Sequence, residues 1–198
     1  MIPIIHFIDR ISIWTGKLAS WLLLVLTFMV CYEVYMRYVL SRPSAWAYDA
    51  GYMLYGALFI LAGAYALARN AHIRGDVLFR LWPIKVQAGL ELVLYVLFFI
   101  PAVGALIYFG YGFAELSWRI GERSSFSPGG PPLYHFKSLI PIAGVLLALQ
   151  GISEMLRCVY CLRYGYFPER LPDVEEIGTE IIQELSEKGA QTSQGVKS

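Results

Sequence analysis

Hydrophobic positions along the chain gather into four windows that are almost free of charged residues. At about 1.5 Å of rise per helical residue, about 20 residues cross a hydrocarbon core about 30 Å thick. Inside lipid, isolated spans satisfy all their backbone polar groups only as helices. The pattern therefore predicts an all-α integral membrane protein with four transmembrane helices, at about residues 18–36, 48–68, 86–113 and 139–160.

Polar segments flank these spans, and composition supports the division. Hydrophobic residues make up 57% of the chain and charged residues only 16%, against about 25% charged in a typical soluble domain. We expect an N-terminal segment at 1–17, a four-span membrane domain at 18–167 and an acidic, partly disordered tail at 168–198. No small-residue cleavage site follows the charged N-terminal segment, so the first span is expected to remain as an uncleaved anchor.

Basic residues are distributed unequally between the two sides of the predicted membrane. Counted near the span ends and so without the far tail, nine lysines and arginines fall on the side that holds both termini and the loop between spans two and three. Five fall on the opposite side. Because lysine and arginine concentrate in cytoplasmic loops, we expect both termini to be cytoplasmic.

The loop between spans two and three contains an unusual polar stretch, "RNAHIRGD" (Arg69–Asp76). A topology signal accounts for its arginines, but such a signal needs neither His72 nor Asp76. Apolar residues then recur at helical spacing over residues 76–85, which predicts a short interfacial helix. The alternative is that these residues simply begin span three.

Small residues recur four apart in spans two and four, which predicts close helix packing. The packing partner is either the four-helix unit itself or another subunit. The residues are Ala62, Gly63, Ala64, Ala66 and Ala68 in span two, with Gly144 and Ala148 in span four.

Three carboxylates fall within or near the predicted spans. Glu33 lies inside the first apolar window, and an intramembrane carboxylate is a candidate functional residue. Arg37 follows four residues later on the same helix face, in a favourable order for pairing. Local pairing, contact with a partner chain and a substrate or proton site all remain open for this pair. Asp49 and Glu91 stand near the starts of spans two and three, where the positive helix terminus stabilises a carboxylate.

Motifs for catalysis are not evident. Cys158 and Cys161 form a lone C-x-x-C without the further ligands that zinc requires or the second pair that redox chemistry favours. The histidines lie outside the spans, which argues against a haem held within the bundle. There is no P-loop motif and no nucleophile–base pair in a defined context. We expect no enzymatic activity, catalytic residue, metal or cofactor in this chain.

The spans also lack the paired repeats and broken helices in which secondary transporters bind substrate. The sequence therefore predicts plain spans in a subunit of a larger complex. Prolines fix the shape of the longest polar loop, residues 117–137, which serves either as a docking surface or as a connector.

Several stretches, taken in order along the chain, are similar to a known family. They are "EVYMRYVL" (Glu33–Leu40), "SAWAYD" (Ser44–Asp49), "GAYALARNAHIRGDVL" (Gly63–Leu78) and the long stretch from Glu122 to Glu154. Over about residues 10–160 the chain resembles the small membrane subunit (DctQ type) of TRAP transporters, the tripartite ATP-independent periplasmic carriers. It is most similar to the longer variant often labelled for mannitol or chloroaromatic compounds. Two positions depart from the family, because Asp49 replaces an expected glutamate and Gly75 replaces an apolar residue.

The resemblance implies a small permease subunit in the bacterial inner membrane. Such a subunit would scaffold a large membrane subunit and help to dock a periplasmic binding protein that delivers an organic acid. The large subunit would bind substrate and sodium, so the complex would use the sodium gradient while this chain holds no cofactor. Membrane lipids are further expected partners, and nucleic acid is not.

Two sets of site residues follow from this interpretation. The first is structural, with His72, Arg74 and Asp76 holding a tight turn, and it consists of Glu33, Arg37, Asp49, His72, Arg74 and Asp76. The second would dock partners on the outer side and consists of Arg42, Arg119, Arg123 and Lys137. Two other functions remain as alternatives: an anchor subunit of a quinone or redox complex that uses Cys158 and Cys161, and a free-standing four-span carrier.

Overall fold

The protein is helical throughout the part of the chain that the computed structural model describes, residues 1–69, 82–127 and 130–171, apart from its loops and one isolated β-bridge. Its elements are α1 (Ile2–Tyr38), α2 (Ala47–Ala68), α4 (Ile84–Leu94), the π-helical turn η1 (Tyr95–Phe99), α5 (Ile100–Ile120) and α6 (Tyr134–Tyr164). Because α4, η1 and α5 follow one another without a break, four helical segments among the described residues are long and apolar enough to cross a membrane. The prediction of an all-α protein with four membrane-spanning helices is confirmed. The interfacial helix expected at 76–85 falls mostly outside the described residues.

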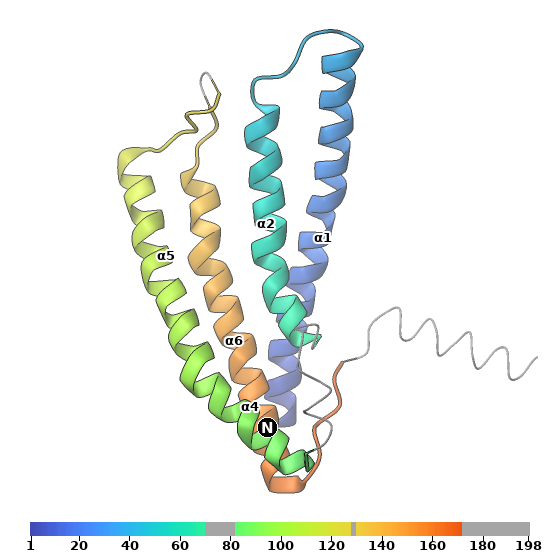
Figure 1. Ribbon diagram of the computed structural model, residues 1–198, viewed down its shortest axis with the longest axis vertical. Helices are drawn as coiled ribbons and strands as arrows, with labels where there is room; N and C mark the ends of the chain where they lie inside the picture. Colours follow the sequence, from blue (N-terminus) through green and yellow to red (C-terminus); the bar gives the residue numbers. More distant parts are fainter. Residues whose placement is uncertain (70–81, 128–129, 172–198) are drawn as a thin grey trace, which may run out of the picture. The chain divides into compact units, whose positions relative to one another are not determined.

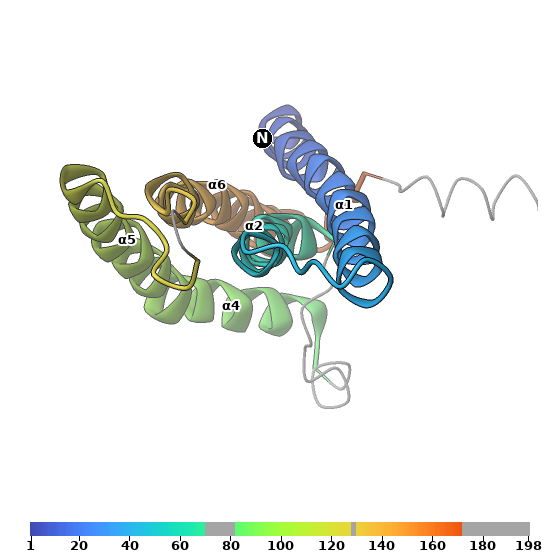
Figure 2. The ribbon, with the colours of Figure 1, turned by 90° about the horizontal axis from the view of Figure 1, so that it is seen from above.

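The helices arrange themselves around α6 within the compact unit Met1–Pro168 (Figures 1 and 2). α1 packs along α2, α5 packs along α6, and α6 also contacts α1, α2 and α4. Figure 2 shows α1 and α5 on opposite sides of this arrangement. In Figure 1 the α1–α2 and α5–α6 connections lie at one end, which we call the loop end. The N-terminus lies at the opposite end, which we call the terminal end.

The first helix is much longer than its apolar window. α1 contains 37 residues and begins at Ile2, whereas the window begins near residue 18. At about 1.5 Å per residue this helix is about 55 Å long, well beyond a hydrocarbon core of about 30 Å. Residues 2–17 remain helical because one face of this segment, which carries Ile5, Ile8, Asp9 and Ser12, is buried against the rest of the unit. The apolar window therefore marks the span but not the helix.

The third span is continuous but not α-helical throughout, which differs from the plain helix that the sequence predicts. The turn Tyr95–Phe99 is π-helical and immediately precedes Ile100 and Pro101. Proline has no backbone N–H and its ring collides with the carbonyl four residues earlier, here that of Leu97. A π-helical turn is one way in which a helix accommodates such a local disruption.

Small residues mediate packing inside this chain. A Cβ atom added to Gly144 on α6 would lie 2.8 Å from Ile107 Cγ1 on α5. On α2, Ala64 and Ala68 are buried. Gly16 on α1 faces the ring of Tyr65 so closely that an added Cβ would overlap it. These contacts favour packing within the unit, one of the two alternatives that the sequence leaves open.

We expect Gly16→Ala to destabilise the isolated chain by about 1–3 kcal/mol, because the added methyl group forces the Tyr65 ring out of place. Gly112→Ala on α5 is the matched control, since its Cβ would meet no atom within 4 Å. Alanine there should be neutral or stabilising by up to about 1 kcal/mol, because it favours helix. Thermal unfolding in detergent measures both variants, and equal midpoints would contradict the close α1–α2 approach.

Candidate functional site

A cluster of buried charged and polar side chains lies between α1 and α6. Arg157 Nη2 donates to Asp9 Oδ2, and only 2% and 3% of these two side chains are exposed. Gln150 Nε2 and Ser153 Oγ both donate to Asp9 Oδ1 at 2.9 Å. A single α1 carboxylate therefore receives three side chains of α6. Since a buried charge is costly unless it is paired and hydrogen-bonded, this geometry holds the two helices in one register.

The same network extends along both helices and beyond the end of α6. Ser12 Oγ donates to Gln150 Oε1 at 2.8 Å, and Glu154 Oε1 lies 3.7 Å from Arg157 Nε. Arg157 Nη1 also donates to the carbonyl oxygen of Pro168 at 3.0 Å. We call this set the α1–α6 polar network; it consists of Asp9, Ser12, Gln150, Ser153, Glu154 and Arg157.

The apolar and charge patterns do not predict this network. Asp9 falls in the expected N-terminal segment 1–17, and Arg157 is one of the nine basic residues that indicate topology. One signal was available, because the polar residues of α6 recur at positions 150, 153, 154 and 157. That spacing marks one helix face and is typical of a polar stripe directed at a neighbouring helix.

Asp49 ties the loop end of α2 to the connection between α5 and α6. It is completely buried in the first turn of α2. Its Oδ1 accepts a hydrogen bond from Ser124 Oγ at 2.5 Å, and its Oδ2 accepts one from Ser127 Oγ. The connection is itself closed by backbone bonds, with Leu133 N donating to Glu122 O at 3.0 Å. Asp49 thus fixes a closed loop onto α2 in addition to occupying a favourable helix terminus.

Glu33 closes the other connection at the loop end. Arg37 Nη2 donates to Glu33 Oε1 at 3.0 Å, and the backbone N–H of Ser44 donates to Glu33 Oε2 at 3.2 Å. The carboxylate therefore joins the last turns of α1 to the segment that leads into α2. Of the roles that the sequence leaves open for this residue, local pairing is the one seen in the described structure.

The four basic residues expected to dock partners differ in their surroundings. Arg42 and Arg123 are exposed on the two connections of the loop end. Arg119 is also exposed, and its Nη2 lies 2.5 Å from Glu115 Oε1. Lys137 is held more firmly, because its Nζ lies 2.5 Å from Glu122 Oε2 and 3.9 Å from the centre of the Phe113 ring. Three of the four therefore expose a charge at the loop end.

The hydrogen bond from Lys137 holds the pKa of Glu122 below its ordinary value of 4.5. A lowered carboxyl pKa means that the ion pair stabilises the loop above that value and is lost only as pH falls through the lower folded pKa. We expect the carboxyl carbon of Glu122 to titrate below pH 4.5 by NMR. In Lys137→Met the midpoint should move upward, and an unchanged midpoint would contradict the pairing.

Glu91 on α4 lies close to the two cysteines of α6, Cys158 and Cys161. Glu91 is in the third turn of α4 rather than its first, so a helix terminus does not account for its position. It is largely buried, and Cys158 Sγ lies 3.6 Å from its Oε2. Cys158 and Cys161 are both buried and free of disulfides. No group of three histidine, cysteine, aspartate or glutamate residues within the described ranges has the geometry to hold a metal ion.

The remaining expected site residues, His72, Arg74 and Asp76, lie outside the described residues. Their role in a tight turn stays a prediction.

Comparison with known proteins adds one finding to this geometry. The family model for tripartite ATP-independent periplasmic transporters, DctQ component, matches residues 26–160, which is more than half of the chain. No curated protein matches the chain significantly. The matched range includes Glu33, Asp49 and the α6 side of the polar network, but not Asp9 or Ser12 on α1.

Proposed function

Because the chain belongs to the DctQ family of tripartite ATP-independent periplasmic (TRAP) transporter components, we propose that it is a rigid scaffold for the large membrane subunit. The family is a transporter component and not an enzyme, which agrees with the resemblance and with the four membrane-spanning helices. In this proposal the large subunit binds and moves an organic acid with an ion gradient. The small subunit stays still beside it.

The observation that carries the scaffold role is the buried α1–α6 polar network. Hydrogen bonds from three α6 side chains converge on the carboxylate of Asp9. A network that is buried and multiply bonded rigidifies the elements it joins, because any sliding leaves charges unpaired. Rigidity of this kind suits a support against which another subunit moves.

The loop end supports a second role, in docking the periplasmic binding protein. Asp49 and Glu33 fix the two connections there, while Arg42, Arg119 and Arg123 expose their charges. Phe126 is 73% exposed and meets the ring of Tyr48 edge-on at 5.6 Å. An exposed aromatic side chain among basic residues fits a partner with an acidic rim around an apolar patch. This role requires the loop end to face the periplasm and both termini to face the cytoplasm, as the distribution of basic residues predicts.

The scaffold proposal predicts a specific assembly. Tagged chain purified from its native membrane in detergent should recover a stoichiometric large membrane subunit, identified by mass spectrometry. In proteoliposomes, uptake should require the chain, the large subunit, the binding protein and a sodium gradient together. Uptake by this chain alone, or its recovery with a haem or iron–sulfur subunit, would contradict the proposal. A variant with Cys158→Ser and Cys161→Ser should transport normally, whereas a redox subunit would lose activity.

A further inference from the structure

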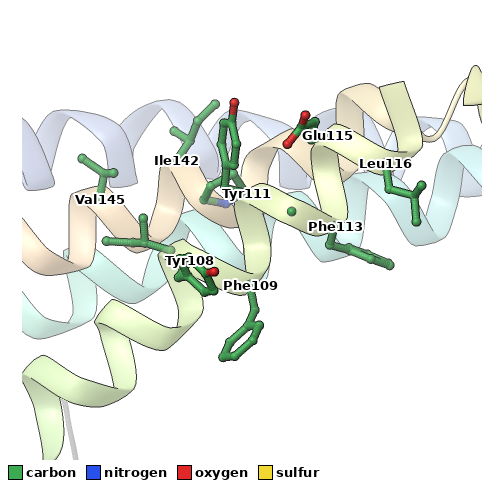
Figure 3. A pocket seen from close by; sticks show the side chains of 11 residues that line it. Tyr108, Phe109, Tyr111, Phe113, Glu115, Leu116, Ile142 and Val145 are labelled. Carbon is green, nitrogen blue, oxygen red and sulfur yellow. The ribbon is translucent and has the colours of Figure 1, made fainter. Parts of the chain in front are cut away.

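An open groove runs along the seam between α5 and α6 (Figure 3). Its volume is about 1050 Å³, and its lining includes Tyr108, Gly112 and Glu115 from α5 with Ile142 and Val145 from α6. A second hollow of about 200 Å³ lies along the same two helices, includes Gly104 and shares Ile107 with the groove. Figure 3 shows the side chains of Phe109, Tyr111 and Phe113 extending from α5 beside it.

Tyr108 is an unusual residue for a surface that meets only lipid tails. It is 75% exposed and lies ten residues before Trp118 in the last turn of α5. At about 1.5 Å per residue this places it about 15 Å below Trp118, half of a hydrocarbon core about 30 Å thick. Tyrosine prefers the membrane interface, because its hydroxyl group needs a hydrogen-bond partner that acyl chains lack. A polar group supplied by another protein segment would satisfy it.

Two glycines make the same surface accessible to a helix backbone. Cβ atoms added to Gly104 or Gly112 would meet no atom within 4 Å. These glycines therefore differ from Gly144, whose added Cβ would collide with Ile107 of this chain. Small residues allow close backbone approach in membranes, where helices associate by packing and hydrogen bonds.

An ion pair on α5 lies where the groove approaches the loop end. Glu115 Oε1 and Arg119 Nη2 form an ion pair at 2.5 Å, with 40% and 74% of their side chains exposed. Glu115 lines the groove directly. An apolar groove that ends in an exposed carboxylate complements a helix with a basic or amide side chain at that depth.

We propose that the α5–α6 groove receives one transmembrane helix of the large subunit, which presents a hydrogen-bonding side chain to Tyr108 and a basic or amide side chain to Glu115. This inference rests on the proposed scaffold function. A second copy of the chain is the alternative occupant, and the cross-linking experiment below distinguishes it from the large subunit. A lipid fits less well because its tails leave the Tyr108 hydroxyl unsatisfied.

Photo-cross-linking within the intact complex tests the position of the large subunit. A photoreactive phenylalanine analogue replaces either Phe109, which is 69% exposed beside the groove, or Phe28, which is 74% exposed on α1. The two sites form a matched pair, because Phe109 lies eleven residues from the end of α5 and Phe28 lies ten residues from the end of α1. We expect the large subunit to cross-link from position 109 and not from position 28. Cross-links from position 28 only, or cross-links from position 109 to lipid or to a second copy, would overturn the proposal.

Substitutions of residues that line the groove provide a second test, in which recovery of the large subunit with the tagged chain is measured. Gly112→Leu should lower recovery of the large subunit at least about fivefold, because it blocks close approach of the incoming helix. Ser20→Leu on α1 adds similar bulk to an exposed site and should leave recovery unchanged. Tyr108→Phe keeps the ring and should lower recovery about threefold through loss of one hydrogen bond. Unchanged recovery in both groove variants would overturn the proposal but leave the scaffold function intact. Loss of the large subunit from the unmodified chain would instead refute the scaffold function.

Discussion

Replacing Arg157 by alanine is expected to lower the free energy of unfolding of the isolated chain by about 3–5 kcal/mol, because removing one member of a buried ion pair leaves the other charge unpaired. The stranded group is Asp9, whose side chain is only 3% exposed. Gln150 and Ser153 would still donate to it, but hydrogen bonds alone do not replace the lost positive charge. Chemical unfolding in detergent, followed by circular dichroism, measures the change.

Two further variants test whether the loss of stability comes from the Asp9–Arg157 ion pair or from the removal of any arginine. Arg163→Ala removes an exposed arginine two turns along α6 and should change stability by no more than about 0.5 kcal/mol. The double variant with Asp9→Leu and Arg157→Met removes both charges and should lose less stability than Arg157→Ala alone. If the double variant loses as much free energy of unfolding as the single variants Asp9→Leu and Arg157→Met lose together, the two side chains do not act as a pair.

Replacing Asp49 by alanine is expected to weaken binding of the periplasmic binding protein strongly while leaving recovery of the large subunit unchanged. The change strands the hydroxyl groups of Ser124 and Ser127, which are buried and donate to this carboxylate. Loss of hydrogen bonds to a charged group, with partners left unsatisfied, costs about 2–4 kcal/mol. The loop that presents Arg123 and Phe126 would then lose its fixed position.

The matched variant is Asp49→Glu, which retains a carboxylate at the position where relatives are expected to have glutamate. It should restore most of the affinity, because the longer side chain still accepts from both serines after a small shift. Binding of labelled binding protein to the membrane complex measures all three forms. Equal affinity in the wild type and Asp49→Ala would show that the α5–α6 connection does not take part in docking.

Side-chain pairs within one helix were predictable from the sequence, and pairs between segments far apart in the sequence were not. Glu33 and Arg37 lie four residues apart on one helix, so their pairing follows from helical geometry alone. Asp9 and Arg157 are 148 residues apart, and Asp49 and Ser124 are 75 apart. No periodicity connects residues at such separations; only the packing of the helices does.

The same distinction explains what the apolar windows predicted about the fold. They identified four spans because lipid requires long apolar helices, and the described residues contain four helices long and apolar enough to cross a membrane. They did not locate the start of α1, because helix buried against protein tolerates Asp9 and Ser12, which lipid would disfavour. The π-helical turn at Tyr95–Phe99 was also missed, since proline signals a disruption without specifying its form.

The α1–α6 polar network also has a consequence for biogenesis. The carboxylate of Asp9 is synthesised 148 residues before its arginine. At about 5–20 residues per second, roughly 7–30 s separate the two during translation. Throughout that interval the first helix holds a carboxylate whose charge has no partner, and only a chain that has completed its last span neutralises it. A truncated chain would leave this charge without its arginine partner, which gives quality-control proteases a feature that distinguishes it from the finished protein.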